Sequence, residues 1–159
     1  MALALIVNMT VVTSYLNYLR CGHNASFLKP SENLNFVASN WGWQMASKKM
    51  FKHSNSNYGE NIAGVGYIAK NGREGTRYVL SAIDSWYAEV KKYNYSQPGF
   101  NAGHFTALVW NFTREYGVSA NYDGIRTVYI VMEFNPPGNV ANYYRKNVFP
   151  NTVCKRRYI

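Results

Sequence analysis

The sequence predicts an α+β domain in which helices pack against an antiparallel sheet. Two segments with the helical spacing of apolar residues, 31–50 and 74–92, precede a C-terminal region with the pattern of paired strands. Helices followed by hairpin strands are typical of folds with separate α and β layers. Of the 159 residues, 47% are hydrophobic and 16% are charged, so the chain can bury one core of its own.

Three helices are predicted, over residues 8–20, 31–50 and 74–92. Ser31 follows a proline and is a suitable N-cap for the second of them. The apolar stripe of that second helix has spacings of three and four and consists of Leu34, Val37, Ala38, Trp41 and Met45. The apolar side of the third helix consists of Val79, Ile83, Trp86, Tyr87 and Val90.

The segments between these helices are predicted to be loops. Residues 52–61 are rich in Asn, Ser and Gly, and the glycines of 63–67 follow no predicted strand, so both are interpreted as irregular. Further along, Asp123-Gly124 lies between two runs rich in β-branched and aromatic residues, which is a strong hairpin signal. The motif Asn-Pro-Pro-Gly-Asn at 135–139 then ends the second strand.

The chain is interpreted as one domain over 1–159, with a core at about 8–150. Residues 1–7 form an apolar N-terminal segment, and residues 151–159 form a basic tail that contains Lys155–Arg157. The N-terminal segment has no basic region and no clear cleavage site of a signal peptide. No run of about 20 apolar residues predicts a transmembrane helix, and Ala2 excludes N-myristoylation of a glycine at that position.

The net charge of +9, from 17 basic and 8 acidic residues, favours acidic partners. Anionic lipid, nucleic acid and acidic glycans all belong to that class. The equal alternative is a solvated basic surface with no specific partner. No phosphate-binding glycine loop and no nucleophile elbow occurs in the chain, so the common nucleotide-binding and serine-hydrolase classes are not predicted.

The two cysteines, Cys21 and Cys154, allow one disulfide but are too few for a disulfide-built fold. No Cys-x-x-Cys pair occurs, so a cysteine zinc site is not predicted. Four N-glycosylation sequons are compatible with secretion, and they begin at Asn8, Asn24, Asn94 and Asn111.

Two histidines and two glutamates in predicted loops or near helix ends are the candidate site residues: His53, Glu60, Glu89 and His104. If they converge, the histidines could bind a divalent transition metal while the carboxylates orient the rings. The same set could instead act as a general acid and base. Their spacing alone favours the plainer alternative of four separately satisfied polar residues. The third histidine, His23, lies in a polar turn and is expected to be exposed.

Three motifs resemble those of the CAP superfamily, the family of cysteine-rich secretory proteins, insect-venom antigen 5 and plant pathogenesis-related protein 1. They are GHFTALVWNFT at 103–113, GENIA at 59–63 and VMEFNPPGN at 131–139. The chain is also similar to the Golgi-associated type of this family, through KHS at 52–54 and SWYAEVKKYNYSQPGF at 85–100. The likeness covers about residues 14–150.

The resemblance implies an α-β-α sandwich, with a three-stranded antiparallel sheet between helical layers and a short helix over 104–111. It also implies a central cleft that holds the four candidate residues, in which His53 and His104 bind Zn²⁺ or another divalent cation in some members. No catalytic residue is established across the family. The resemblance therefore favours a non-enzymatic protein that binds lipids, sterols or anionic membrane surfaces, with no nucleic-acid partner.

Two alternatives stay open, a secreted defence, effector or venom-like interaction protein and a metal-dependent hydrolase. An extracellular location is expected, with a Golgi or cytosolic membrane-peripheral location as the alternative, and a homodimer is left open. The chain departs from the family at Leu16, where many members have histidine, and at Met132, where most secreted members have cysteine. Cys21 and Cys154 do not match the family's usual bridges, so their pairing is open.

Overall fold

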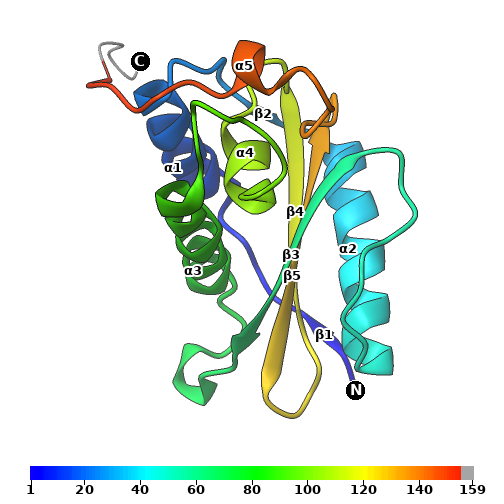
Figure 1. Ribbon diagram of the computed structural model, residues 1–159. Helices are drawn as coiled ribbons and strands as arrows, with labels where there is room; N and C mark the ends of the chain where they lie inside the picture. The colour runs from blue at the N-terminus through cyan, green and yellow to red at the C-terminus, as the bar shows by residue number, and fades with distance from the viewer. Residues whose placement is uncertain (155–159) are drawn as a thin grey trace.

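The protein is a three-layer α-β-α sandwich, which confirms the predicted fold class (Figure 1). The computed structural model describes residues 1–154. Helix α2 (Glu32–Lys48) packs on one face of the central sheet, against its strands β4 and β5. Helices α1 (Met9–Gly22), α3 (Thr76–Tyr87) and α4 (Gly103–Val109) gather on the opposite face. Within residues 1–154, no helix is both long and apolar enough to span a bilayer.

The sheet consists of three long antiparallel strands and two very short ones. The long strands are β3 (Gly59–Gly66), β4 (Glu115–Tyr122) and β5 (Thr127–Asn135), and β5 lies between the other two. The short strands β1 (Leu3–Ala4) and β2 (Lys29–Pro30) both pair with β4. Residues 1–7 are predicted to lie outside the core. In the structure they contribute strand β1 and the buried side chain of Leu5.

The hairpin predicted at Asp123-Gly124 is present between β4 and β5. Asp123 Oδ1 accepts hydrogen bonds from the backbone N–H groups of Ile125, Arg126 and Thr127. Gly124 has a φ of 78°, a left-handed conformation that glycine adopts without steric cost. The turn is therefore closed by one carboxylate and one glycine, and it fixes the register of the two strands.

The predicted helices are present, with bounds that differ by a few residues. Ser31 caps α2 as expected, because its hydroxyl accepts from the Leu34 N–H. The third predicted helix is α3 followed by the 3₁₀ turn η2 (Ala88–Lys92). Helix α4 confirms the helix expected over 104–111. A 3₁₀ turn η1 (Ala69–Asn71) and a one-turn helix α5 (Tyr144–Asn147) complete the chain.

The loop prediction holds for residues 52–58 but is wrong from residue 59 on, because strand β3 occupies Gly59–Gly66. All eight residues of β3 pair with β5 in an unbroken register from Gly59 opposite Phe134 to Gly66 opposite Thr127. Its glycines weaken the local preference for a strand. Pairing with the apolar strand β5 overrides that preference, and only the tertiary structure shows it.

The prediction that His23 is exposed is also wrong, since the ring is fully buried. Its Nδ1 lies 2.7 Å from the Phe149 carbonyl oxygen, and its Nε2 lies 2.9 Å from the Tyr87 hydroxyl. Burial lowers the pKa of His23, and the hydrogen bond to Phe149 offsets this only partly. The chain near Phe149 covers a turn that the local sequence marks as polar.

Helix α1 carries a fully buried arginine, Arg20, which binds four backbone carbonyl oxygens. Its Nε donates to Ser26 at 2.6 Å and its Nη1 to Leu108 at 2.8 Å. Its Nη2 donates to Trp110 at 3.0 Å and to Thr113 at 3.2 Å. The guanidinium therefore joins α1 to the end of α4 and to the chain that follows it.

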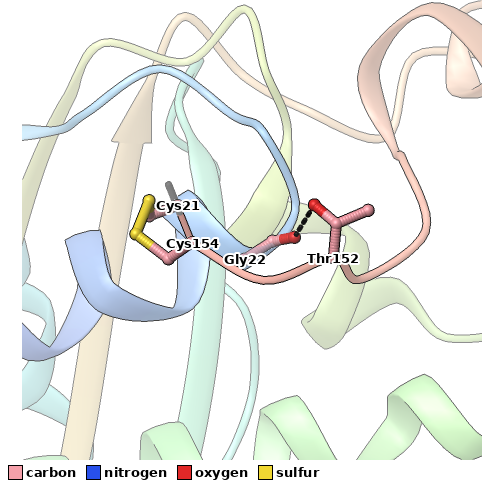
Figure 2. The surroundings of a disulfide bond; sticks show 4 residues. All are labelled: Cys21, Gly22, Thr152 and Cys154. Carbon is pink, nitrogen blue, oxygen red and sulfur yellow. Dashed lines mark hydrogen bonds between the residues drawn. A yellow bond between two sulfur atoms is a disulfide. The ribbon is translucent and has the colours of Figure 1, made fainter. Parts of the chain in front are cut away.

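Cys21 and Cys154 form a disulfide, which settles the pairing that the sequence leaves open (Figure 2). The bond joins the end of α1 to the last described residue. Beside it, the Thr152 N–H and hydroxyl both donate to the Gly22 carbonyl oxygen, at 2.7 and 3.3 Å. The basic run Lys155–Arg157 lies outside the described residues.

Replacing both cysteines, Cys21→Ser with Cys154→Ser, should lower the free energy of unfolding by about 2–4 kcal/mol. The bond links residues 133 positions apart, so its loss frees a long loop in the unfolded chain. Urea unfolding under non-reducing conditions measures the effect, and the wild type with a reductant should reproduce it. An unchanged midpoint in the double variant would contradict the expectation.

Candidate functional site

The first half of the candidate site is a histidine–carboxylate pair at the start of β3. His53 Nδ1 lies 2.6 Å from Glu60 Oε1, which also accepts the Ser54 N–H at 2.9 Å. The Ser54 hydroxyl donates to the other oxygen of Glu60. The His53 side chain is 60% exposed whereas that of Glu60 is 6% exposed, so the carboxylate lies behind the ring.

The second half is a histidine–carboxylate pair between η2 and α4. His104 Nδ1 lies 2.8 Å from Glu89 Oε1, and the His104 N–H donates to Glu89 Oε2 at 3.0 Å. The Phe105 N–H reaches the same oxygen at 3.4 Å. Glu89 therefore holds the imidazole and also satisfies backbone donors in the first turn of α4. The Trp86 ring stacks on the His104 ring, with centroids 6.1 Å apart.

Hydrogen bonds of two asparagines position the start of α4 relative to the sheet. Asn61, the residue after Glu60, donates its side-chain N–H to the His104 carbonyl oxygen at 3.1 Å. Asn139 donates to the Gly103 carbonyl oxygen at 2.9 Å and accepts from the Thr106 hydroxyl. The start of α4 is thus tied to β3 on one side and to the chain after β5 on the other.

The same ring nitrogen faces the carboxylate in both pairs. A neutral imidazole that donates Nδ1–H to a carboxylate presents the lone pair of Nε2 to a ligand, which is the arrangement found around metal-bound histidines. Across residues 1–154, no hydrogen bond to Nε2 of His53 or of His104 is formed. In each pair, donation of Nδ1–H to the carboxylate would leave Nε2 free to act as one ligand of a divalent cation.

The sequence-predicted residues are thus brought together as two pairs, His53 with Glu60 and Glu89 with His104. In the described part of the chain, no group of three or more His, Cys, Asp and Glu side chains is placed to hold a metal ion. A cation in the cleft would have to complete its coordination with water or with a ligand. Such a site is weaker than a structural zinc site with four protein ligands.

Sequence reasoning missed a third acidic residue, Glu133, which lies directly opposite Glu60 across the β3–β5 pair. Its side chain is 0% exposed. The pKa of Glu133 is raised to about 9, first by burial and then by the neighbouring Glu60, while a hydrogen bond from Ser56 at 3.3 Å acts in the opposite direction. A single glutamate within the apolar run of 127–134 is the sequence signal that could have found it.

Glu60 and Glu133 form a carboxyl pair whose two pKa values are shifted in opposite directions. Burial alone would raise the pKa of Glu60, but its interaction with Glu133 and the hydrogen bonds from Ser54 and His53 outweigh burial and lower that pKa. Glu133 is therefore the neutral, proton-bearing member and Glu60 the anionic one. The single negative charge of the pair lies on the oxygen atoms that face His53.

The asparagines of the four sequons differ in their exposure and in the hydrogen bonds that their side chains form. Asn111 is half-buried, and its side-chain oxygen accepts from the Ser26 N–H and hydroxyl. Asn8, Asn24 and Asn94 are exposed, although Asn8 caps α1 and Asn94 caps a turn. Asn111 is therefore less accessible to a glycosyltransferase in the folded protein than the three exposed asparagines.

Residues 13–134 match the family model described as CAP, the cysteine-rich secretory protein family. Golgi-associated plant pathogenesis-related protein 1 of Homo sapiens is 36% identical to this chain over 142 residues. The aligned region covers 84% of this chain and 87% of the human protein.

Solved structures share the fold at lower sequence identity. The one named "Structure of BmVAL-1" has a TM-score of 0.68 and 21% identity, over 89% of this chain and 79% of that chain. The one named "Crystal structure of NaASP2 with Zn2+" has a TM-score of 0.67 and 19% identity, over 88% of this chain and 83% of that chain. At these identities the likeness shows the shared architecture.

Proposed function

Because this chain belongs to the cysteine-rich secretory protein (CAP) family, we propose that it is a non-enzymatic binding protein for lipid. In this proposal it docks on anionic membrane surfaces, takes lipids or sterols as partners, and holds one divalent cation in its cleft. The observation that carries the membrane part is a basic and aromatic segment at the end of α2.

That segment is Lys48–Lys52, of sequence KKMFK. Its three lysines are exposed, and the Phe51 ring between them is 58% exposed. A ring that enters the lipid headgroup region together with lysines that meet anionic headgroups is a common way for a protein to bind at a membrane surface. Each lysine near such a surface contributes about 1 kcal/mol. The net charge of +9 supports the same orientation.

Replacing Lys48, Lys49 and Lys52 together by serine should weaken binding to phosphatidylserine-containing vesicles by about 100-fold, from about 1 kcal/mol per lysine. Flotation at a series of salt concentrations measures this, and binding of the wild type should fall as salt rises. The control removes three other exposed lysines, Lys70, Lys91 and Lys92, and so has the same net charge. Equal loss in both variants would show that total charge, not this segment, binds the membrane.

Two observations support the cation in the cleft. Both histidines have Nδ1 against a carboxylate, so Nε2 is the nitrogen left for a metal. A structural neighbour of the same fold, NaASP2, was solved with Zn²⁺. In this chain, His53 and His104 would hold the ion, while Glu60 and Glu89 orient the rings and strengthen them as ligands. The bound ion would supply a Lewis-acidic centre open to water or to an anionic group.

Zinc affinity should be at least tenfold weaker at pH 5.5 than at pH 7.5, by calorimetric titration. Zinc needs neutral imidazoles, and free histidine takes up a proton below about pH 6.5. The double change His53→Ala with His104→Ala should abolish binding, whereas the surface change Glu115→Gln should leave it intact. An affinity that does not vary with pH, or that survives loss of both rings, would remove the cation from the proposal.

The hydrolase alternative has less support from the site geometry. Both oxygens of Glu60 and both oxygens of Glu89 already accept hydrogen bonds from the protein. A general base must reach the proton that it abstracts, and these carboxylates are engaged in holding rings and backbone instead.

An extracellular location fits the binding role. The matching family is described as secretory, and the Cys21–Cys154 disulfide is typical of proteins that fold in an oxidising compartment. The Golgi-associated human relative keeps the membrane-peripheral location as the alternative.

A further inference from the structure

Residues 149–154 form a segment that runs from α5 to the end of α1, and we call it the C-terminal strap (Figure 1). None of its residues is buried, and Val153 is 82% exposed. A pocket of about 500 Å³ is lined by the end of α1, by Tyr87 and by residues 151–154 of the strap. Apolar packing therefore does little to hold the strap on the rest of the protein.

Hydrogen bonds attach the strap to the protein at Phe149, Asn151 and Thr152. Each such bond contributes little net stability, because a detached strap would form hydrogen bonds with water instead. The loss of backbone freedom over six residues opposes them. We therefore expect the strap to stay in place only while the disulfide holds Cys154 at Cys21, as Figure 2 shows it.

The strap completes the hydrogen bonding of the buried His23 ring. A carbonyl oxygen can only accept, so Nδ1 donates to Phe149, and Nε2 accepts from the Tyr87 hydroxyl. That hydroxyl in turn accepts from the Asn151 side chain at 3.3 Å. If the strap left, the buried Nδ1–H of His23 would lose its acceptor, which is unfavourable. The ring would then have to move or to meet water.

The His23 ring also contacts both segments that carry the second half of the candidate site. Its centroid lies 5.2 Å from that of Phe105, the residue after His104, and 5.7 Å from that of Tyr87. Tyr87 is the last residue of α3, two positions before Glu89. A displacement of His23 would therefore act on both partners of the Glu89–His104 pair through direct contacts.

We propose that the Cys21–Cys154 disulfide is a redox switch of the cleft: its reduction by a dithiol releases the strap and loosens the Glu89–His104 pair. A thiolate of the reductant attacks the sulfur of Cys154, the more exposed cysteine, and forms a mixed disulfide while Cys21 leaves as a thiolate. The second thiol of the reductant then displaces Cys154. The reductant gives up two electrons and becomes a disulfide, and its two protons end on Cys21 and Cys154.

Amide spectra of the metal-free full chain, recorded with and without dithiothreitol, test the switch. On reduction, the backbone order parameters of residues 150–153 should fall below about 0.6, the range of flexible chain. The amide signals of His104 and Phe105 should shift, because the His104 N–H donates to Glu89. The amide of Val65, at the far end of β3, should keep its position.

The double change Cys21→Ser with Cys154→Ser should give the reduced spectrum without any reductant, and dithiothreitol should then change nothing. Two results would overturn the proposal. One is a strap that keeps order parameters near about 0.85 after reduction. The other is a set of shifts confined to the two cysteines and the strap, with His104 and Phe105 unchanged. The reduced wild type gives both readings if the double variant does not fold.

The effect of the switch on cation affinity rests on the proposed function, whereas release of the strap does not. Calorimetric titration with zinc compares the wild type with the double serine variant, without reductant because thiols bind zinc themselves. The variant should bind zinc about tenfold more weakly, the usual effect of disturbing groups that orient a ligand histidine. Equal affinity would overturn the coupling to the cleft. No zinc binding by the wild type would count against the proposed cation site, and the amide spectra would then decide the switch.

Discussion

Replacing Arg20 by methionine should destabilise the protein by about 3–5 kcal/mol, as the loss of a buried hydrogen-bonded charge does elsewhere. The guanidinium is fully buried, and four carbonyl oxygens accept its hydrogen bonds. Methionine fills a similar length but donates nothing, so these buried oxygens would lose their partners. The pKa of Arg20 is lowered to about 9, first by burial and then by the charge of Arg114, so the folded environment disfavours the cation and its carbonyl partners matter more.

Urea unfolding followed by circular dichroism measures this effect. Arg20→Lys should fall between wild type and methionine, because one ammonium cannot reach all the acceptors of the planar fork. The matched control is Arg114→Met, which removes an exposed arginine and should cost less than about 0.5 kcal/mol. A methionine variant as stable as the wild type would show that the four contacts contribute nothing net. Because Leu108 and Trp110 lie at the end of α4, the variant should also disturb His104.

The second large effect concerns pH and Glu133. In the unfolded chain this carboxyl group has an ordinary pKa near 4.5, whereas in the folded chain its pKa is raised to about 9. The folded protein therefore holds a proton that the unfolded protein releases between these values. The stability contributed by Glu133 is complete below about pH 4.5 and is lost as the pH rises through about 9. The loss is at most about 1.4 kcal/mol per pH unit.

The change Glu133→Gln should flatten this dependence, because the amide stays neutral and can still donate to Glu60. The measured quantity is the difference in unfolding free energy between the variant and the wild type at pH 6, 7, 8 and 9. Taking the difference removes the pH dependence that other titratable groups contribute to the unfolding free energy. His23 is one of these groups, and its lowered pKa acts in the opposite direction at acidic pH. Glu115→Gln, an exposed change of the same kind, should run parallel to the wild type. Parallel curves for Glu133→Gln would mean that Glu133 is ionised in the folded protein.

The elements that the sequence predicts correctly are those stabilised by residues close together in the chain. The stripe through Leu34, Ala38 and Met45 predicts α2, because these residues bury one face of a helix wherever it packs. Asp123-Gly124 predicts its hairpin for the same reason, since carboxylate and glycine close the turn themselves. Strand β3 differs, because its glycines carry little strand preference and its order comes from β5, more than 60 residues away.

The candidate site shows the same limit. Nothing in their spacing places Glu89 beside His104 or His53 beside Glu60; the CAP motifs were needed to predict that these residues belong to one site. Glu133 was missed because a glutamate in a strand is ordinarily placed on the solvent side. His23 was misplaced because the chain that buries it, around Phe149, is 126 residues further on. Each of these positions depends on a contact between distant segments.

The Cys21–Cys154 bond makes residues 21–154 one covalent ring. That ring contains strands β2 to β5 and helices α2, α3, α4 and α5. A protease that cuts once inside it, for example in the exposed chain around Asn55, opens the ring but releases no fragment. The cut molecule should stay one species on a non-reducing gel and separate into two only after reduction. A protein of this connectivity can therefore be cleaved once in a protease-rich surrounding and still keep all its parts attached.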